Sequence, residues 1–91
     1  IDIPLSGVGI NATHSASLNW IASTSAIAGY DIYRSPASVV IWTKLNSSLV
    51  PTTFYTDWDV LSGQSYIYAV TAADAAGVES LFSNLAPATI P

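Results

Sequence analysis

Apolar and polar residues alternate with a period of two along several short segments of this chain. The longest of these runs from Ser65 to Ala73, where one face carries Tyr66, Tyr68, Val70 and Ala72 and the other carries Ile67, Ala69 and Thr71. This is the periodicity of a β-strand. No stretch keeps the apolar spacing of three and four residues that an amphipathic helix needs. The pattern therefore predicts an all-β chain.

Seven segments of this kind can be placed between turn residues. They are Ile1 to Gly9, Ser15 to Ala22, Ala28 to Arg34, Val39 to Leu45, Thr53 to Thr56, Ser65 to Ala73 and Leu81 to Thr89. The first and last contain Pro4 and Pro87, which suits edge strands because proline cannot donate to a ladder. Short strands between turn signals favour a β-sandwich. Neither a repeat nor an internal linker interrupts the chain, so we expect residues 1–91 to form a single domain.

A glycine turn leads into the longest predicted strand. Gly63 stands three residues before Tyr66, the first aromatic of that strand. A tyrosine in this position can bury its ring and direct its hydroxyl to the backbone of the preceding turn, as in the tyrosine corner of Greek-key sandwiches. We therefore expect Tyr66 to stabilise the fold and to take no part in binding.

Five short motifs follow one another along the chain. They are Leu18-Asn19-Trp20, Gly29-Tyr30-Asp31-Ile32-Tyr33-Arg34, Tyr55-Thr56-Asp57, the corner from Gly63 to Tyr66, and Gly77-Val78-Glu79-Ser80 with Ser83-Asn84. In this order the chain resembles a fibronectin type III domain from about Pro4 to Pro91. Its low charge and its many Ser, Thr and Ala residues are similar to modules of bacterial multidomain secreted or surface proteins.

The resemblance implies an immunoglobulin-like, seven-strand Greek-key β-sandwich with Trp20 at the centre of its core. The expected core residues are Trp20, Tyr30, Ile32, Tyr66, Tyr68 and Val70. The chain departs from the family in two places. Leu61-Ser62-Gly63 stands where many members carry a proline, and Val39-Val40-Ile41-Trp42 is apolar where members are often polar or glycine-rich.

Composition narrows the choice of partners. Arg34 and Lys44 are the only strong cations, and the net charge is −4. A polyanion requires several Lys or Arg contacts, so we expect neither nucleic acid nor an anionic membrane surface as a partner. The chain has no cysteine for a disulfide or thiolate site, and no apolar run approaches the roughly 20 residues that cross a membrane. We expect no membrane insertion.

The residues that could carry catalysis or bind a metal are few. His14 is the only histidine, and no Gly-x-Ser-x-Gly motif accompanies it. Asp57 and Asp59 lie two residues apart, and Asp74 and Glu79 flank one loop. These carboxylates fall short of the six to eight oxygens that Ca²⁺ prefers, and Asp57 and Asp59 stand where a turn needs side-chain caps. We therefore expect no enzyme activity, no cofactor and no metal.

Exposed aromatic residues provide the one candidate interaction surface. Tyr33 and Trp42 are expected on adjacent strands with outward rings, Trp58 in a loop, and Val40 beside Trp42. Such rings can stack on sugars or anchor a protein partner. The favoured alternative is that Trp42 covers the stem of Arg34 and has only a structural role. A third possibility is self-association through an edge strand at Val39–Trp42.

These observations favour a non-catalytic module that spaces and orients neighbouring domains of a secreted or cell-surface protein. Both chain ends read as cut from a longer protein, and we expect a monomer. A carbohydrate-binding or protein-binding module is the alternative. The loop from Asp74 to Glu79 contains no arginine, so the Arg-Gly-Asp adhesion of some family members is not implied. Use of the sequons at Asn11 and Asn46 stays open.

Overall fold

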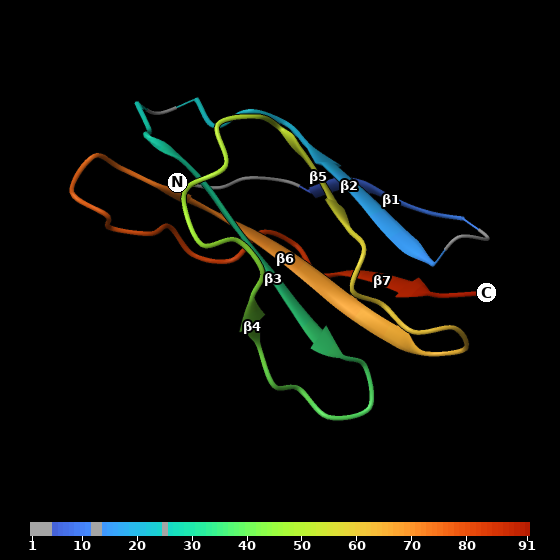
Figure 1. Cartoon of the computed structure of the whole chain (residues 1–91). Coiled ribbons are helices and arrows are strands. Elements are labelled where there is room, and N and C mark those ends of the chain that lie inside the picture. Colours follow the sequence, from blue (N-terminus) through green and yellow to red (C-terminus); the bar gives the residue numbers. More distant parts are fainter. Residues whose placement is uncertain (1–4, 12–13, 25) are drawn as a thin grey trace.

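The computed structural model describes residues 5–11, 14–24 and 26–91, which form two facing β-sheets (Figure 1). Within these residues there are seven strands and no helix: β1 (Leu5–Asn11), β2 (Ser15–Trp20), β3 (Gly29–Pro36), β4 (Thr43–Lys44), β5 (Phe54–Asp57), β6 (Ser65–Ala73) and β7 (Ala86–Thr89). One sheet has the order β1-β2-β5 and the other β4-β3-β6-β7, with antiparallel pairing throughout. The predicted all-β sandwich is confirmed. Among the described residues no helix is long and apolar enough to span a membrane.

The core lies between the two sheets. The six expected core residues are all buried, with exposed fractions of 0–9%. Trp20, from β2, meets the ring of Tyr30, from β3, edge to face with 5.4 Å between the ring centres. The indole N–H of Trp20 is buried and has no hydrogen-bond partner. The side chain of Trp20 is therefore positioned by packing and not by a hydrogen bond.

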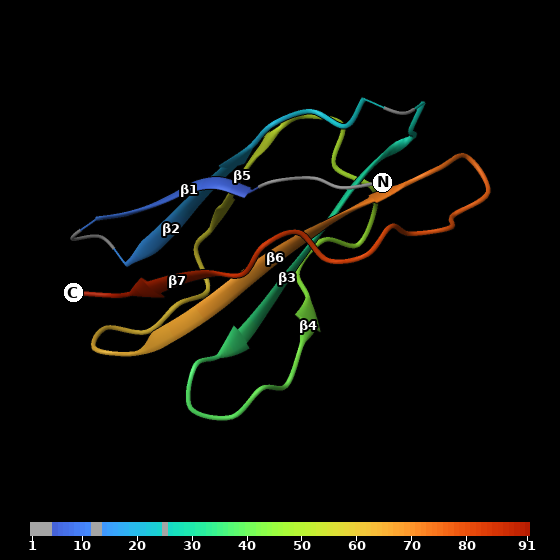
Figure 2. The same ribbon diagram turned by 180° about the vertical axis from the view of Figure 1, so that it is seen from behind.

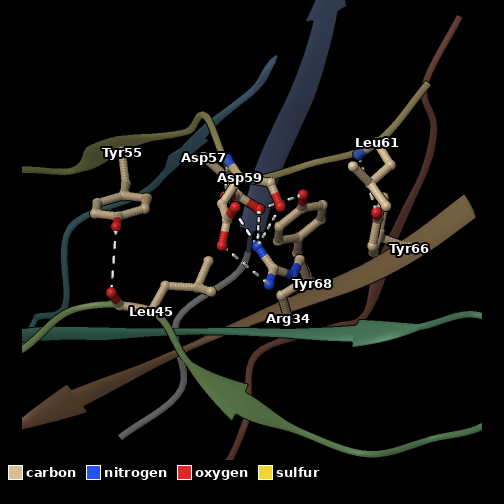
Figure 3. A network of polar contacts seen from close by, with 8 residues as sticks. All are labelled: Arg34, Leu45, Tyr55, Asp57, Asp59, Leu61, Tyr66 and Tyr68. Atoms are coloured by element: carbon tan, nitrogen blue, oxygen red, sulfur yellow. Dashed lines mark hydrogen bonds and ion pairs between the residues drawn. The ribbon is translucent and has the colours of Figure 1, made fainter. Parts of the chain in front are cut away.

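The tyrosine corner is confirmed. The hydroxyl of Tyr66 accepts a hydrogen bond of 3.1 Å from the backbone N–H of Leu61, in the turn that precedes β6 (Figure 3). Gly63 has a φ of +79°, a conformation that residues with a Cβ rarely adopt. Its backbone N–H donates to the carbonyl of Ile90. The turn thus fixes the start of β6 and also ties the end of the chain to it.

The predicted strand from Val39 to Leu45 is wrong for most of its length, since only Thr43–Lys44 pairs with β3. The Ser35 hydroxyl accepts a hydrogen bond from the Ile41 N–H at 2.8 Å and contacts the Val39 carbonyl at 3.3 Å. These hydrogen bonds hold the segment in a loop, so it does not pair with β3 as a strand. The apolar run is therefore no edge strand, and Val39, Val40 and Ile41 are about 60% exposed.

Other strand boundaries also shift. The strand expected from Leu81 to Thr89 is limited to Ala86–Thr89, and the one expected from Ser15 to Ala22 ends at Trp20. The first strand begins at Leu5, and Pro4 lies outside the described residues. The sequon at Asn11 extends into residues 12 and 13, which also lie outside them.

The two ends of the described chain lie at opposite ends of the sandwich. Leu5 pairs with Trp20, near the end of β6 that carries Ala72, whereas Thr89 pairs with Ser65 at the start of β6. The view from behind shows β7 running outward to the C-terminus (Figure 2). The molecule is elongated, with principal extents of 38, 23 and 21 Å.

Candidate interaction surface

Three aromatic side chains meet on the face of the four-stranded sheet that points away from the core. Tyr33 follows the buried Ile32 on β3, so its ring points outward. The ring centre of Phe82 lies 5.1 Å from that of Tyr33 and 5.0 Å from that of Trp42. We call Tyr33, Trp42 and Phe82 the aromatic cluster. Phe82 is its central member and is 40% exposed.

Two serines place Phe82 over the sheet. Beyond the part of β6 that pairs with β7, Val70 and Ala72 have no neighbouring strand on that edge. Ser83 donates its N–H to the Val70 carbonyl and accepts the Val70 N–H with Oγ, both at 2.9 Å. Ser80 does the same for Ala72, at 2.8 and 3.0 Å. Each serine thus satisfies two backbone groups of β6, and the chain between them carries Phe82 outward.

A charged group adjoins the aromatic cluster. Lys44 is the register partner of Tyr33, and its ammonium lies 5.8 Å from the centre of that ring. It also lies 3.6 Å from Oδ2 of Asp31 and 4.0 Å from Oε2 of Glu79. Both separations exceed the length of an ordinary hydrogen bond. The three donors of Lys44 therefore stay available between two carboxylates.

Glu79 and Tyr33 fix each other's protonation. The hydroxyls of Tyr33 and Thr71 donate to Oε1 of Glu79 at 2.5 and 2.7 Å. These hydrogen bonds lower the pKa of Glu79, the one from Tyr33 having the larger effect. Burial raises the pKa of Tyr33, and the hydrogen bond and charge of Glu79 raise it further. At neutral pH a neutral Tyr33 hydroxyl therefore donates to an ionised carboxylate.

A hairpin turn after β6 brings Glu79 next to Tyr33 and Thr71. Asp74 accepts hydrogen bonds from the backbone N–H groups of Ala76 and Val78 at 2.9 and 3.0 Å. Gly77 supplies a φ of +83°, and the returning chain forms an antiparallel bridge between Ala73 and Glu79. Asp74 thus caps the turn.

A cavity of about 280 Å³ opens beside the charged group. Its lining is mostly polar and consists of Asp31, Lys44, Asn46, Ser47, Ser48, Leu49, Ala73, Gly77 and Glu79. The Asn46 amide nitrogen donates to Asp31 Oδ1 at 2.8 Å and to the carbonyls of Ser48 and Tyr30 at 2.9 and 3.3 Å. The nitrogen to which an N-glycan would attach is therefore already engaged in holding the wall of the cavity.

The structure separates the residues that the sequence grouped as one surface. Tyr33 and Trp42 meet through Phe82. Val40 lies in the exposed β3–β4 loop, and Trp58 lies in the β5–β6 loop with 68% of its surface exposed. The aromatic ring beneath Arg34 is that of Tyr66, at 5.6 Å. Trp42 instead packs on Phe82.

Asp57 and His14, the remaining candidates for a chemical role, lie apart from the aromatic cluster. Asp57 is buried, accepts hydrogen bonds from Arg34 and Tyr68, and caps the backbone N–H of Asp59 at 3.1 Å (Figure 3). His14 is exposed in the β1–β2 turn with a φ of +58°. No group of three or more possible metal ligands occurs in the part of the chain that the structure describes.

Sequence reasoning missed Phe82 and the part played by Glu79. The sequence places Phe82 in a predicted strand, where alternation alone says nothing about its neighbours. The available signal was a pair of serines three residues apart, Ser80 and Ser83, on either side of an apolar dipeptide. Serine side chains readily replace backbone partners in this way.

Comparison with known proteins finds relatives that match most of the chain. No family model matches it. It is 37% identical over 75 residues to an amylopullulanase of Thermoanaerobacter thermohydrosulfuricus, covering 82% of this chain and 5% of that protein. It is 38% identical over 79 residues to an alpha-amylase of Niallia circulans, covering 85% of this chain and 6% of that protein. The chain thus spans only a small part of these relatives.

Among solved structures, the chain is similar to an Fn3-like protein from Clostridium thermocellum. The TM-score is 0.78 and the sequence identity is 30%. The match covers 96% of this chain and 91% of that chain. It therefore extends over nearly the full length of both proteins.

Proposed function

The chain belongs to the fibronectin type III family, and from this membership we propose that it is a non-catalytic module that positions neighbouring domains in a longer secreted or cell-surface protein. The observation that carries the proposal is the difference in coverage. The chain matches the amylopullulanase over 82% of its own length but over only 5% of that protein. A segment of this size is a minor part of such an enzyme, which supports an accessory role.

The names of the relatives indicate the setting. The matching proteins are named amylopullulanase and alpha-amylase. We infer that the longer protein is a bacterial polysaccharide-degrading enzyme that acts outside the cell, with this module as one of its accessory domains.

The shape of the module supports a positioning role. The described chain starts and ends at opposite ends of a sandwich 38 Å long. The last residues are held against the β5–β6 turn, because Gly63 and Gln64 exchange backbone hydrogen bonds with Ile90, both at 2.9 Å. A chain fixed in this way up to Ile90 transmits the orientation of the module to whatever follows it.

The test uses the longer protein, with the module replaced by a flexible Gly/Ser linker that covers the same span. Small-angle X-ray scattering should show a broader distribution of distances between the flanking domains. Turnover of a small soluble substrate should stay unchanged. Loss of that turnover in a correctly folded replacement protein would contradict the proposal, and so would an unchanged distance distribution.

A further inference from the structure

We propose that the aromatic cluster and the adjoining cavity together form a binding site for a neutral oligosaccharide. The site goes beyond the positioning role and does not depend on it. It lies on the outer face of the four-stranded sheet and combines a partly exposed aromatic surface with charged side chains, Lys44 and Glu79, that line a cavity. Those are the two kinds of contact that a sugar ring offers to a protein.

The two parts of the site form one continuous surface. Trp42 packs on Phe82, and Phe82 packs on Tyr33. Tyr33 in turn lies under the ammonium of Lys44 and donates its hydroxyl to Glu79. Lys44 and Glu79 both line the cavity. The aromatic cluster and the polar cavity are therefore adjacent and connected by direct side-chain contacts.

The aromatic part suits the C–H face of a sugar. Phe82 is 40% exposed although it packs on two rings, and an aromatic ring carries a negative face that attracts weakly positive C–H groups. Leu81 beside it is 86% exposed. Ser80 and Ser83 hold both ends of this segment on β6, so the apolar surface is already in place before a ligand arrives.

The polar part suits hydroxyl groups. Lys44 can donate three hydrogen bonds, yet its carboxylate neighbours lie at 3.6 and 4.0 Å. Oε1 of Glu79 accepts two hydroxyls, and Oε2 lies 4.0 Å from the ammonium of Lys44. A hydroxyl between these groups could accept a hydrogen bond from Lys44 and donate one to Glu79. Each hydroxyl group of a sugar can accept and donate hydrogen bonds in this way.

Size and charge restrict the ligand. The cavity of about 280 Å³ is slightly smaller than typical small-molecule pockets, which start near 300 Å³. A cavity of this size would hold only part of an oligomer, so the remainder would extend over the aromatic cluster. Two carboxylates, Asp31 and Glu79, face a single ammonium in a chain of net charge −4. This excess of negative charge disfavours uronates and phosphorylated sugars.

The experiment titrates the ¹⁵N-labelled chain with maltohexaose, with cellohexaose and with hexagalacturonate while recording NMR spectra. At least one neutral oligomer should shift the amides of Lys44, Glu79 and Phe82 and the indole N–H of Trp42 in a saturable manner. Phe82→Ala should raise the dissociation constant about threefold to tenfold. Lys44→Met, which keeps the side-chain stem, should also raise it.

Trp58→Ala is the matched control, because Trp58 is an exposed aromatic outside the cluster. It should leave the dissociation constant within about twofold of the unaltered protein. Thermal unfolding of each variant confirms that the chain is folded at the temperature of the titration. If a variant is not folded, the shifts of the unaltered chain still map the site.

Three results would overturn the proposal. One is no saturable shift with either neutral oligomer up to about 10 mM. Another is equal weakening by Trp58→Ala and Phe82→Ala, and the third is tighter binding of hexagalacturonate. Concentration-dependent shifts of the same amides without sugar would instead identify a protein contact, and sedimentation would show it. None of these results affects the linker-replacement test, so the positioning role is tested independently.

Discussion

Arg34 donates from Nη1 to both carboxylate oxygens of Asp57, at 3.0 and 2.9 Å, and so joins β3 of one sheet to the end of β5 in the other (Figure 3). The buried hydroxyl of Tyr68 donates to the same carboxylate at 2.8 Å. Burial lowers the pKa of Arg34, but the hydrogen bond and charge of Asp57 outweigh it and leave the pKa raised. Burial, followed by the contact with Asp57, raises the pKa of Tyr68. The three groups act as one polar unit that aligns the two sheets.

Replacing Arg34 should therefore lower the free energy of unfolding substantially. Arg34→Met keeps most of the side-chain volume but leaves the buried carboxylate of Asp57 without its counter-ion. We expect a loss of about 3–5 kcal/mol in the free energy of unfolding, measured by urea denaturation at neutral pH. Adding Asp57→Asn to Arg34→Met should recover part of this loss, since it removes the unpaired charge. A loss below about 1 kcal/mol would mean that water or Tyr68 compensates for Arg34.

Tyr66→Phe tests the tyrosine corner. The substitution keeps the ring and removes only the acceptor for the Leu61 N–H. We expect a loss of about 1–2 kcal/mol, because a backbone donor in the turn is left without its partner. Tyr55→Phe is the control, since the Tyr55 hydroxyl reaches the Leu45 carbonyl only at 3.5 Å. Equal effects of the two variants would show that the corner has no special role.

Ser83→Ala tests how the segment that carries Phe82 is attached. Ser83 is buried, and alanine would leave the Val70 N–H without an acceptor. We expect a loss of about 1–3 kcal/mol and faster hydrogen exchange at the Val70 amide. Ser80→Ala should have a smaller effect, because Ser80 is only half-buried and water can replace its hydroxyl. Unchanged exchange at Val70 would contradict the proposed role of Ser83.

Glu79 should contribute to the loss of folding stability at acid pH. Hydrogen bonds from Tyr33 and Thr71 lower its pKa below the usual 4.5. An acid whose pKa is lower in the folded state contributes stability above its unfolded pKa, and that stability is lost as the pH falls through the folded pKa. We expect Glu79→Gln to flatten the decline in the free energy of unfolding below about pH 4.5. Asp59→Asn, at a side chain that is 97% exposed, should leave the decline as it is.

Trp20→Ala should cost at least about 3 kcal/mol in urea denaturation, because the side chain is buried between the sheets and its removal leaves a cavity. Trp20→Phe should cost less than Trp20→Ala. The indole N–H makes no hydrogen bond, so phenylalanine loses volume but no polar partner. If Trp20→Phe were as harmful as Trp20→Ala, the packing of the indole edge would matter more than its volume.

The sequence predicted strands well where the strand pattern is local. β6 has the predicted limits, because nine residues alternate after a turn that requires Gly63. The predictions failed where pairing depends on distant residues. Val39–Trp42 has an apolar composition that fits an edge strand, but hydrogen bonds to Ser35 draw it into a loop. Residues 81–85 fit an edge strand as well, but two serines occupy the β6 edge in place of a backbone ladder.

The sequence by itself determined the fold class, the tyrosine corner and the core residues, because strand alternation and turn glycines are local features and because the order of the short motifs resembles that of a known family. Only the tertiary structure decided how the surface is arranged. Phe82 joins Tyr33 to Trp42, and Glu79 meets Tyr33 46 positions away in the sequence. Contacts of this kind depend on which strands lie side by side and on how loops cross the sheet. The free energy of burial fixes these relations for the chain as a whole, and no local pattern contains them.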